Sequence, residues 1–139
     1  MTTPAGGGRR RRGRELALRV LFELEGTDKD AETALAYQAE EVGATPDVRA
    51  FAERLVLGCL VNRELIDASV SAASRWSLSD VGKVERAVLR LGTCELLESD
   101  GTPVAVIVDE SLELARAYAG DDAVQYVNGV LGQIARERV

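Results

Sequence analysis

Apolar residues in this chain recur every three or four positions, and short clusters of glycine, proline and polar residues interrupt each run. Ala17, Val20, Leu21 and Leu24 form the first such series. This spacing gathers apolar side chains on one face of an α-helix, whereas a half-buried strand would alternate apolar and polar residues. The pattern predicts an all-α protein of about six or seven helices joined by short loops.

The composition of residues 104–108 is compatible with either a helix or a strand. The β-branched run over residues 104–108 would also suit a strand. We favour a helix because Ile107, Leu114 and Tyr118 continue at helical spacing beyond it.

Turn and capping signals give the expected helix boundaries. The first helix is expected to begin at Arg14, and the long apolar stretch over residues 48–73 is expected to break near Val61–Asn62. A side-chain oxygen just before a helix can accept from its unpaired backbone N–H groups, and proline suits the first helical position. The expected caps are Asp28, Asp47 and Thr102, the last followed by Pro103 as the first helical residue.

The length of 139 residues suits one domain. Residues 1–8 are small and glycine-rich and are expected to form a disordered tail, which leaves 9–139 as the helical domain. Cys59 and Cys94 are far apart in sequence and flanked by apolar residues, so we expect two buried thiols rather than a disulfide framework. No secretory signal or membrane-spanning run is visible, and a cytoplasmic protein is expected.

Positive charge is concentrated at one end of an acidic chain. The formal net charge is −6, yet residues 9–19 hold six arginines against the single acid Glu15. The rest carries 11 positive and 22 negative groups, so a basic segment of +5 precedes a body of −11. Arginine can pair with phosphate and stack on bases, and a flexible arginine run could order on an RNA. A solubilising tail or an expression remnant would have the same composition, which leaves both interpretations open.

The residue types argue for binding rather than catalysis. The chain has no histidine, which removes the commonest general base and metal ligand. Glycine-rich phosphate loops are missing. Glu95 and Glu110 lie near apolar faces and could form a carboxylate pair, but carboxylates satisfied by arginine or backbone explain them more simply. We therefore expect no enzyme and no cofactor.

The stretch DDAVQYVNGVLGQIA raises a second binding candidate. Val127 and Val130 would face the core, so Tyr126 would be partly turned away from it. Tyr126 and Asn128 could cover the core edge, or they could offer an aromatic ring and an amide to a base. Asp121 and Asp122 are simply explained as first-turn acids favoured by the helix dipole.

Three stretches together resemble one family, the transcription antitermination factors of the NusB type. They are RRRRGRELALRVLFELE, VGKVERAVLRLGTCEL and TPVAVIVDESLELARAYAGDDAVQYVNGVLGQIA. The resemblance covers about residues 9–136. It implies two small helical subdomains and an RNA-binding, non-enzymatic protein. It also implies binding to the boxA element of nascent RNA together with the small-subunit ribosomal protein NusE, in a complex with other Nus factors and RNA polymerase.

The resemblance assigns roles to individual positions. Phe22 stands where the family often has tyrosine, and Gln125 where a lysine can occur, so each lacks one polar contact of the family pattern. Glu85 and Arg90 match polar positions that would face NusE, although an ion pair on a solvated face would also explain them. The implied RNA-binding set is Arg10, Arg11, Arg12, Arg14, Phe22, Asp122, Gln125, Tyr126 and Asn128.

Rival interpretations remain at this point. A NusB-like domain of a ribosomal RNA methyltransferase would need a further methyl-donor-binding domain. A helical adaptor would bind only proteins and carry the arginines as a tail. A carboxylate-bridged metal enzyme is the most remote alternative, because it would need Glu-x-x-His pairs. Whether the protein is a monomer or a homodimer stays open.

Overall fold

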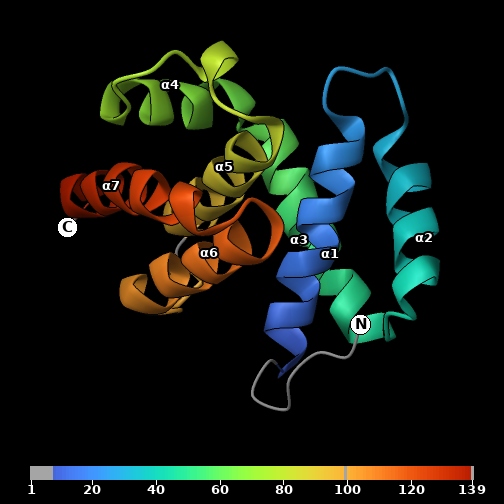
Figure 1. Ribbon diagram of the computed structural model, residues 1–139. Coiled ribbons are helices and arrows are strands. Elements are labelled where there is room, and N and C mark those ends of the chain that lie inside the picture. The colour runs from blue at the N-terminus through green and yellow to red at the C-terminus, as the bar shows by residue number, and fades with distance from the viewer. Residues whose placement is uncertain (1–7, 99, 139) are drawn as a thin grey trace. The chain divides into compact units, whose positions relative to one another are not determined.

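The computed structural model describes residues 8–98 and 100–138 (Figure 1). Across these residues the chain forms seven α-helices, one short 3-10 helix and no strand. The all-α prediction is confirmed, including a helix over residues 104–108. Of the expected tail over residues 1–8, residues 1–7 lie outside the described residues, whereas Gly8 is the first residue of helix α1. None of the described helices is both long enough and apolar enough to cross a membrane.

The chain divides into two compact units, one ending at Leu57 and the other starting at Gly58. The first unit contains α1 (Gly8–Leu24), α2 (Ala31–Val42) and most of α3 (Pro46–Val61). Apolar side chains from all three helices are buried, and they follow the predicted spacing. They include Leu16, Ala17 and Val20 of α1, Ala34 and Leu35 of α2, and Val48, Ala52, Leu55 and Val56 of α3.

The first helix begins earlier than the sequence predicts. α1 starts at Gly8, so Arg9–Arg12 are helical instead of forming a flexible run before Arg14. Arginine is a good helix former, and Arg9 Nη1 donates to Asp47 Oδ2 of α3 at 2.7 Å. This ion pair anchors the first turn. Phe22 also differs from the expected apolar stripe, because it is 46% exposed.

Three expected caps are displaced by one or two residues. Asp30, not Asp28, caps α2, and its Oδ2 accepts from the Thr33 backbone N–H at 3.0 Å. Asp47 lies inside the first turn of α3. Pro103 occupies the N-cap of α6 (Val104–Tyr118), one position earlier than expected. Thr102 instead donates its hydroxyl to Asp100 at 2.7 Å, a local bond that competes with capping.

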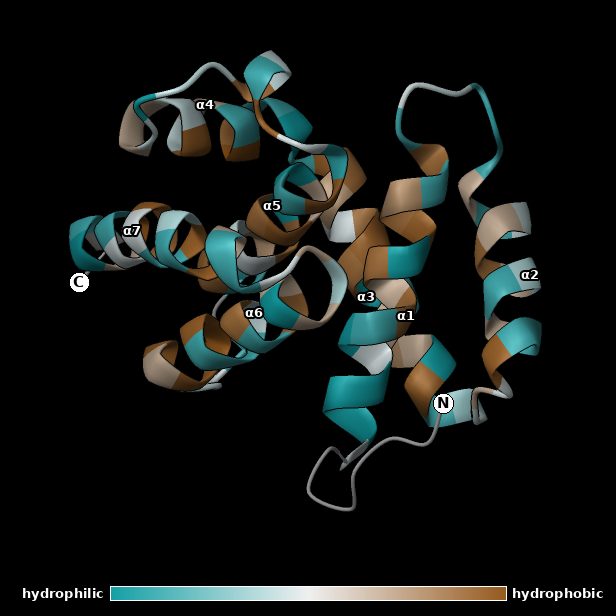
Figure 2. Ribbon diagram, viewed as in Figure 1, coloured by the Kyte–Doolittle hydropathy of each residue, from teal (hydrophilic) through white to brown (hydrophobic). Residues whose placement is uncertain are grey.

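The second unit is built around α5 (Lys83–Glu98), which contacts α4 (Arg63–Ala73), α6 and α7 (Asp121–Arg138). The 3-10 helix η2 (Leu78–Asp80) joins α4 to α5. The predicted break at Asn62 is confirmed, since α3 ends at Val61 and α4 begins at Arg63. Figure 2 shows apolar residues along α5 where it is surrounded by these helices. Nine residues of α5 are buried: Ala87, Val88, Leu89, Leu91, Gly92, Thr93, Cys94, Glu95 and Leu96.

The two cysteines are buried free thiols, as the sequence predicts. A hydrogen bond with Cys94 and burial raise the pKa of the Cys59 thiol well above its usual range. Cys59 Sγ also donates to the Arg90 carbonyl at 3.7 Å. Both features keep Cys59 protonated and make it a packing residue in the contact of α3 with α5.

A glycine sets the close approach of α5 to its neighbours. A Cβ atom at Gly92 would lie 2.7 Å from Ser111 Oγ of α6 and 3.0 Å from Leu131 Cδ1 of α7. Ser111 is buried, and its hydroxyl donates to the Ile107 carbonyl at 2.8 Å. The hydroxyl therefore cannot move aside without breaking this bond. At Gly129 of α7, by contrast, a Cβ would meet nothing within 4 Å.

We predict that Gly92→Ala is less stable than Gly129→Ala by about 1–3 kcal/mol, the usual cost of overpacking a core. Both changes gain the same helix propensity, so their difference isolates the packing at Gly92. Urea unfolding followed by circular dichroism measures it. Equal stability of the two variants would contradict the close packing described for α5, α6 and α7.

Candidate nucleic-acid interface

The arginines in the first two turns of α1 differ in their exposure to solvent. Arg10 and Arg12 are exposed and Arg11 is half-buried. Arg14, by contrast, is only 3% exposed. Arg14 lies on the same face of the helix as Leu18, which is one turn later and buried in the core. Arg14 was expected to contact phosphate, but its burial favours a structural role.

Phe51 of α3 gathers three guanidinium groups of the first unit. The Cζ atoms of Arg10, Arg54 and Arg14 lie 5.0, 5.2 and 5.7 Å from the centre of its ring. These distances suit cation–π attraction, which holds the planar cations near one another despite their like charge. A Cβ at Gly13 would clash with the Phe51 ring, so the close approach of this ring to α1 requires glycine there. The Phe51 ring thus keeps these three guanidinium groups close to one another.

Arg19, the last arginine of the basic segment, is committed to structure. Its Nε donates to Gln38 Oε1 of α2 at 3.0 Å, and Gln38 Nε2 donates to Glu23 Oε1 at 2.7 Å. The Gln38 bond lowers the pKa of the Glu23 carboxyl. Arg19 therefore joins α1 to α2, and within the basic segment the exposed cations are Arg9, Arg10 and Arg12.

Asp47 moderates the charge at this end of the first unit. Hydrogen bonds from the Thr45 hydroxyl, at 2.5 Å, and from Arg9 lower the pKa of Asp47 to about 2. Asp47 is thus ionised at neutral pH and offsets Arg9.

We predict that Asp47 titrates near pH 2 in the folded protein, which carboxyl 13C NMR can measure. Because the folded pKa lies below the ordinary 3.8, the carboxylate stabilises the fold above about pH 4, and this contribution is lost as the pH falls toward 2. Thr45→Val should raise the pKa more than Arg9→Ala, since the Thr45 bond is the larger cause. A wild-type pKa near 3.8 would show that these bonds do not form.

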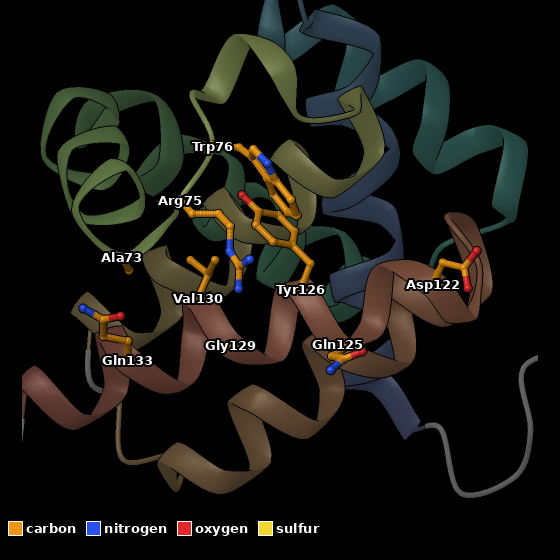
Figure 3. A pocket seen from close by; sticks show the side chains of 9 residues that line it. All are labelled: Ala73, Arg75, Trp76, Asp122, Gln125, Tyr126, Gly129, Val130 and Gln133. Carbon is orange, nitrogen blue, oxygen red and sulfur yellow. The ribbon is translucent and has the colours of Figure 1, made fainter.

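A groove of about 500 Å³ lies in the second unit, between the end of α4 and one side of α7 (Figure 3). It combines aromatic, cationic, amide and carboxylate side chains. Its lining residues are Ala73, Arg75, Trp76, Asp122, Gln125, Tyr126, Gly129, Val130 and Gln133. Three residues of the sequence-predicted RNA set, Asp122, Gln125 and Tyr126, are therefore brought together here. Asn128 is exposed on α7 but is not part of the lining.

Trp76 and Tyr126 form the aromatic wall of this groove. Their ring centres lie 4.9 Å apart at an interplanar angle of 48°. Figure 3 shows the two rings beside each other, with Arg75 extending toward α7 next to them. The Arg75 guanidinium lies 5.5 Å from the Trp76 ring.

Ser74 forms hydrogen bonds with the backbone of Trp76 and with the hydroxyl of Tyr126. Its Oγ donates to the Trp76 carbonyl at 2.9 Å, accepts from the Trp76 N–H at 3.1 Å, and lies 2.6 Å from the Tyr126 hydroxyl. A serine hydroxyl has one proton and two lone pairs. Since the proton goes to Trp76, Tyr126 is the donor in the third bond. The hydroxyl of Tyr126 is therefore engaged inside the protein.

The residues expected to face a protein partner have structural contacts. Arg90 of α5 makes two hydrogen bonds to Asp67 of α4, at 2.8 and 3.2 Å, and its side chain is 11% exposed. Arg63 also pairs with Asp67, at 3.2 Å. Arg90 thus holds α4 against α5. Glu85 is half-buried in the first turn of α5, and its carboxylate lies beside Gly82. A negative charge at this end of a helix interacts favourably with the helix dipole.

Sequence reasoning missed Trp76, Arg75 and Gln133 as members of the groove. The available signal was the single tryptophan of the chain, placed next to an arginine in a serine-rich turn. Arginines near one another and an aromatic groove are features of proteins that bind nucleic acid.

Comparison with known proteins identifies the family. The NusB family model matches residues 11–136. The transcription antitermination protein NusB of Heliobacterium modesticaldum is 40% identical over 129 residues, which cover 92% of this chain and 63% of that protein. The structure of T. maritima NusB has a TM-score of 0.84 and 34% identity, and the match covers 99% of this chain and 94% of that one. The chain belongs to the NusB family.

A second solved structure adds a bound state of a similar protein. A crystal structure of antitermination factors NusB and NusE in complex with double-stranded RNA contains a chain with a TM-score of 0.85 and 28% identity. The match covers 93% of this chain and 98% of that chain.

Proposed function

We propose that this protein is a transcription antitermination factor that binds boxA-type RNA together with NusE. The family match over residues 11–136 carries the proposal. It is supported by the similar NusB chain found with NusE and RNA. The protein would then join other Nus factors and RNA polymerase in the cytoplasm and support transcription of ribosomal RNA operons. Its role would be binding, with no catalytic step.

The arginines at the start of α1 would hold the RNA backbone. Arg10, Arg11 and Arg12 present planar guanidinium groups that can form paired hydrogen bonds with phosphate oxygens. Their helical placement means that they are partly ordered before RNA arrives, which lowers the entropy lost on binding. The exposed ring of Phe22 on the same helix could pack against a sugar or a base.

The second unit would add contacts to bases. Tyr126 supplies an aromatic wall, while Asp122, Gln125 and Asn128 are exposed polar side chains on α7. An amide can both donate to and accept from a base edge, and a carboxylate can accept from an exocyclic amine. Gln125 provides such a contact without the positive charge of a lysine.

The acidic body suits a basic protein partner. Outside residues 9–19 the net charge is −11, and complementary charge speeds the encounter of two proteins. We propose that NusE, a ribosomal protein, docks on the second unit near Glu85. Arg90 would contribute indirectly, because its bonds to Asp67 hold α4 and α5 together.

The test is RNA binding by fluorescence anisotropy, with a boxA-like single strand, a scrambled strand and a boxA duplex. Each RNA is titrated with and without NusE across a salt series. We predict selective binding that tightens with NusE. Changing Arg10, Arg11 and Arg12 to alanine should weaken binding and reduce the log–log salt slope by about 0.7 per lost phosphate contact to a single strand.

A matched control removes the same number of positive charges elsewhere. Lys29, Arg63 and Arg116 are solvent-exposed and paired with acids, so their change to alanine should leave the slope nearly unchanged. If the two triple variants weakened RNA binding equally, the affinity would depend only on the net charge of the protein and not on the position of the arginines. Absence of selectivity and of any NusE effect would refute the proposal and favour an adaptor that binds only proteins.

A further inference from the structure

Trp76 is the most exposed ring of the groove defined above. Its side chain is 50% exposed, whereas Tyr126 is half-buried and its hydroxyl is bonded to Ser74. An indole offers a large flat apolar surface with one polar N–H, and exposing it to water is unfavourable. Its position beside a groove, not over the core, indicates a surface for a flat ligand.

The ring is held in place before any ligand binds. Two Ser74 hydrogen bonds fix the Trp76 backbone, and Tyr126 packs against the indole at a centroid distance of 4.9 Å. Ser74 also bonds to Tyr126, so three side chains restrain one another. A restrained aromatic loses little conformational entropy when a ligand stacks on it.

The rim of the groove carries groups that match a nucleotide. Gln125 and Gln133 can each donate to and accept from a base edge. Asp122 can accept from an exocyclic amine, and Arg75 can pair with a phosphate. The groove volume of about 500 Å³ lies within the range of about 300–1,000 Å³ typical of small-ligand sites.

We propose that Trp76 is a base-stacking residue, and that this groove takes one unpaired nucleobase of the bound RNA. Arg75 contacts the phosphate beside that base, and the α7 side chains meet its edge. The inference rests on the proposed RNA-binding function and names the residue that distinguishes an unpaired base from a paired one. A base inside a duplex is stacked between its neighbours and cannot enter the groove.

Intrinsic fluorescence tests this directly, because Trp76 is the only tryptophan in the chain. The boxA-like single strand is titrated into the wild-type protein, with and without NusE, after correction for NusE emission. We expect quenching of the Trp76 emission that saturates together with the anisotropy signal. The fully paired boxA duplex should bind with little quenching.

Variants separate stacking from charge. Trp76→Ala should weaken single-strand binding about tenfold or more, in line with base stacking on aromatic side chains, and should leave the salt slope unchanged. Trp76→Phe keeps a ring and should bind more tightly than the alanine variant. Tyr37→Ala, at a 58% exposed position on α2, serves as the matched aromatic control and should bind like wild type. Circular dichroism checks that each variant folds, and the wild-type fluorescence stands if one does not.

The outcomes distinguish the two proposals. RNA that binds by anisotropy without changing Trp76 emission, and equally well to Trp76→Ala, would overturn the base-stacking role and leave the antitermination function intact. If NusE alone quenched the Trp76 emission, and Trp76→Ala weakened only the binding of NusE, the base-stacking role would be overturned and Trp76 would instead contact the protein partner. RNA that does not bind to the wild-type protein at all would overturn both proposals.

Discussion

Burial of α5 by α4, α6 and α7 is the packing arrangement on which the second unit depends. Gly92 permits the close approach of α6 and α7. With Val127, Val130 and Leu131 of α7 buried, the helical period turns other α7 side chains away from the core. Tyr126 is among them and therefore reaches Ser74 and Trp76 at the end of α4. The groove is thus a consequence of how α7 packs in the unit.

The first unit supplies charge through a different arrangement. Gly13 allows Phe51 to approach α1, and the ring then holds the guanidinium groups of Arg10, Arg14 and Arg54 nearby. Asp47 pairs with Arg9 and anchors the first turn. Phosphate pairing is strong but insensitive to sequence, whereas stacking and hydrogen bonds to base edges can discriminate. The proposed function assigns the first task to the first unit and the second task to the groove.

Features set by neighbours in sequence were predictable, and features set by distant residues were not. The helical class, the break at Asn62 and the first-turn acids of α7 follow from local spacing and composition. The ion pair of Arg9 with Asp47, in the early first turn of α1, joins residues 38 positions apart. The bonds of Arg90 to Asp67 cross 23 residues, and the contact of Ser74 with Tyr126 crosses 52. The single tryptophan beside an arginine marks Trp76 as a candidate in the sequence, but only that last contact places it beside Tyr126.

We propose that one RNA contacts both the arginines of α1 and the Trp76 groove. Amide and indole chemical shifts of 15N-labelled protein, recorded with and without a boxA-like single strand, test it most directly. We expect chemical-shift changes concentrated at residues 9–12, at Ser74–Trp76 and Tyr126, and at the Trp76 indole N–H. The exposed start of α6 near Val104 and Val106 should change little. Changes confined to α1, or centred on the exposed face of α6, would contradict the claim.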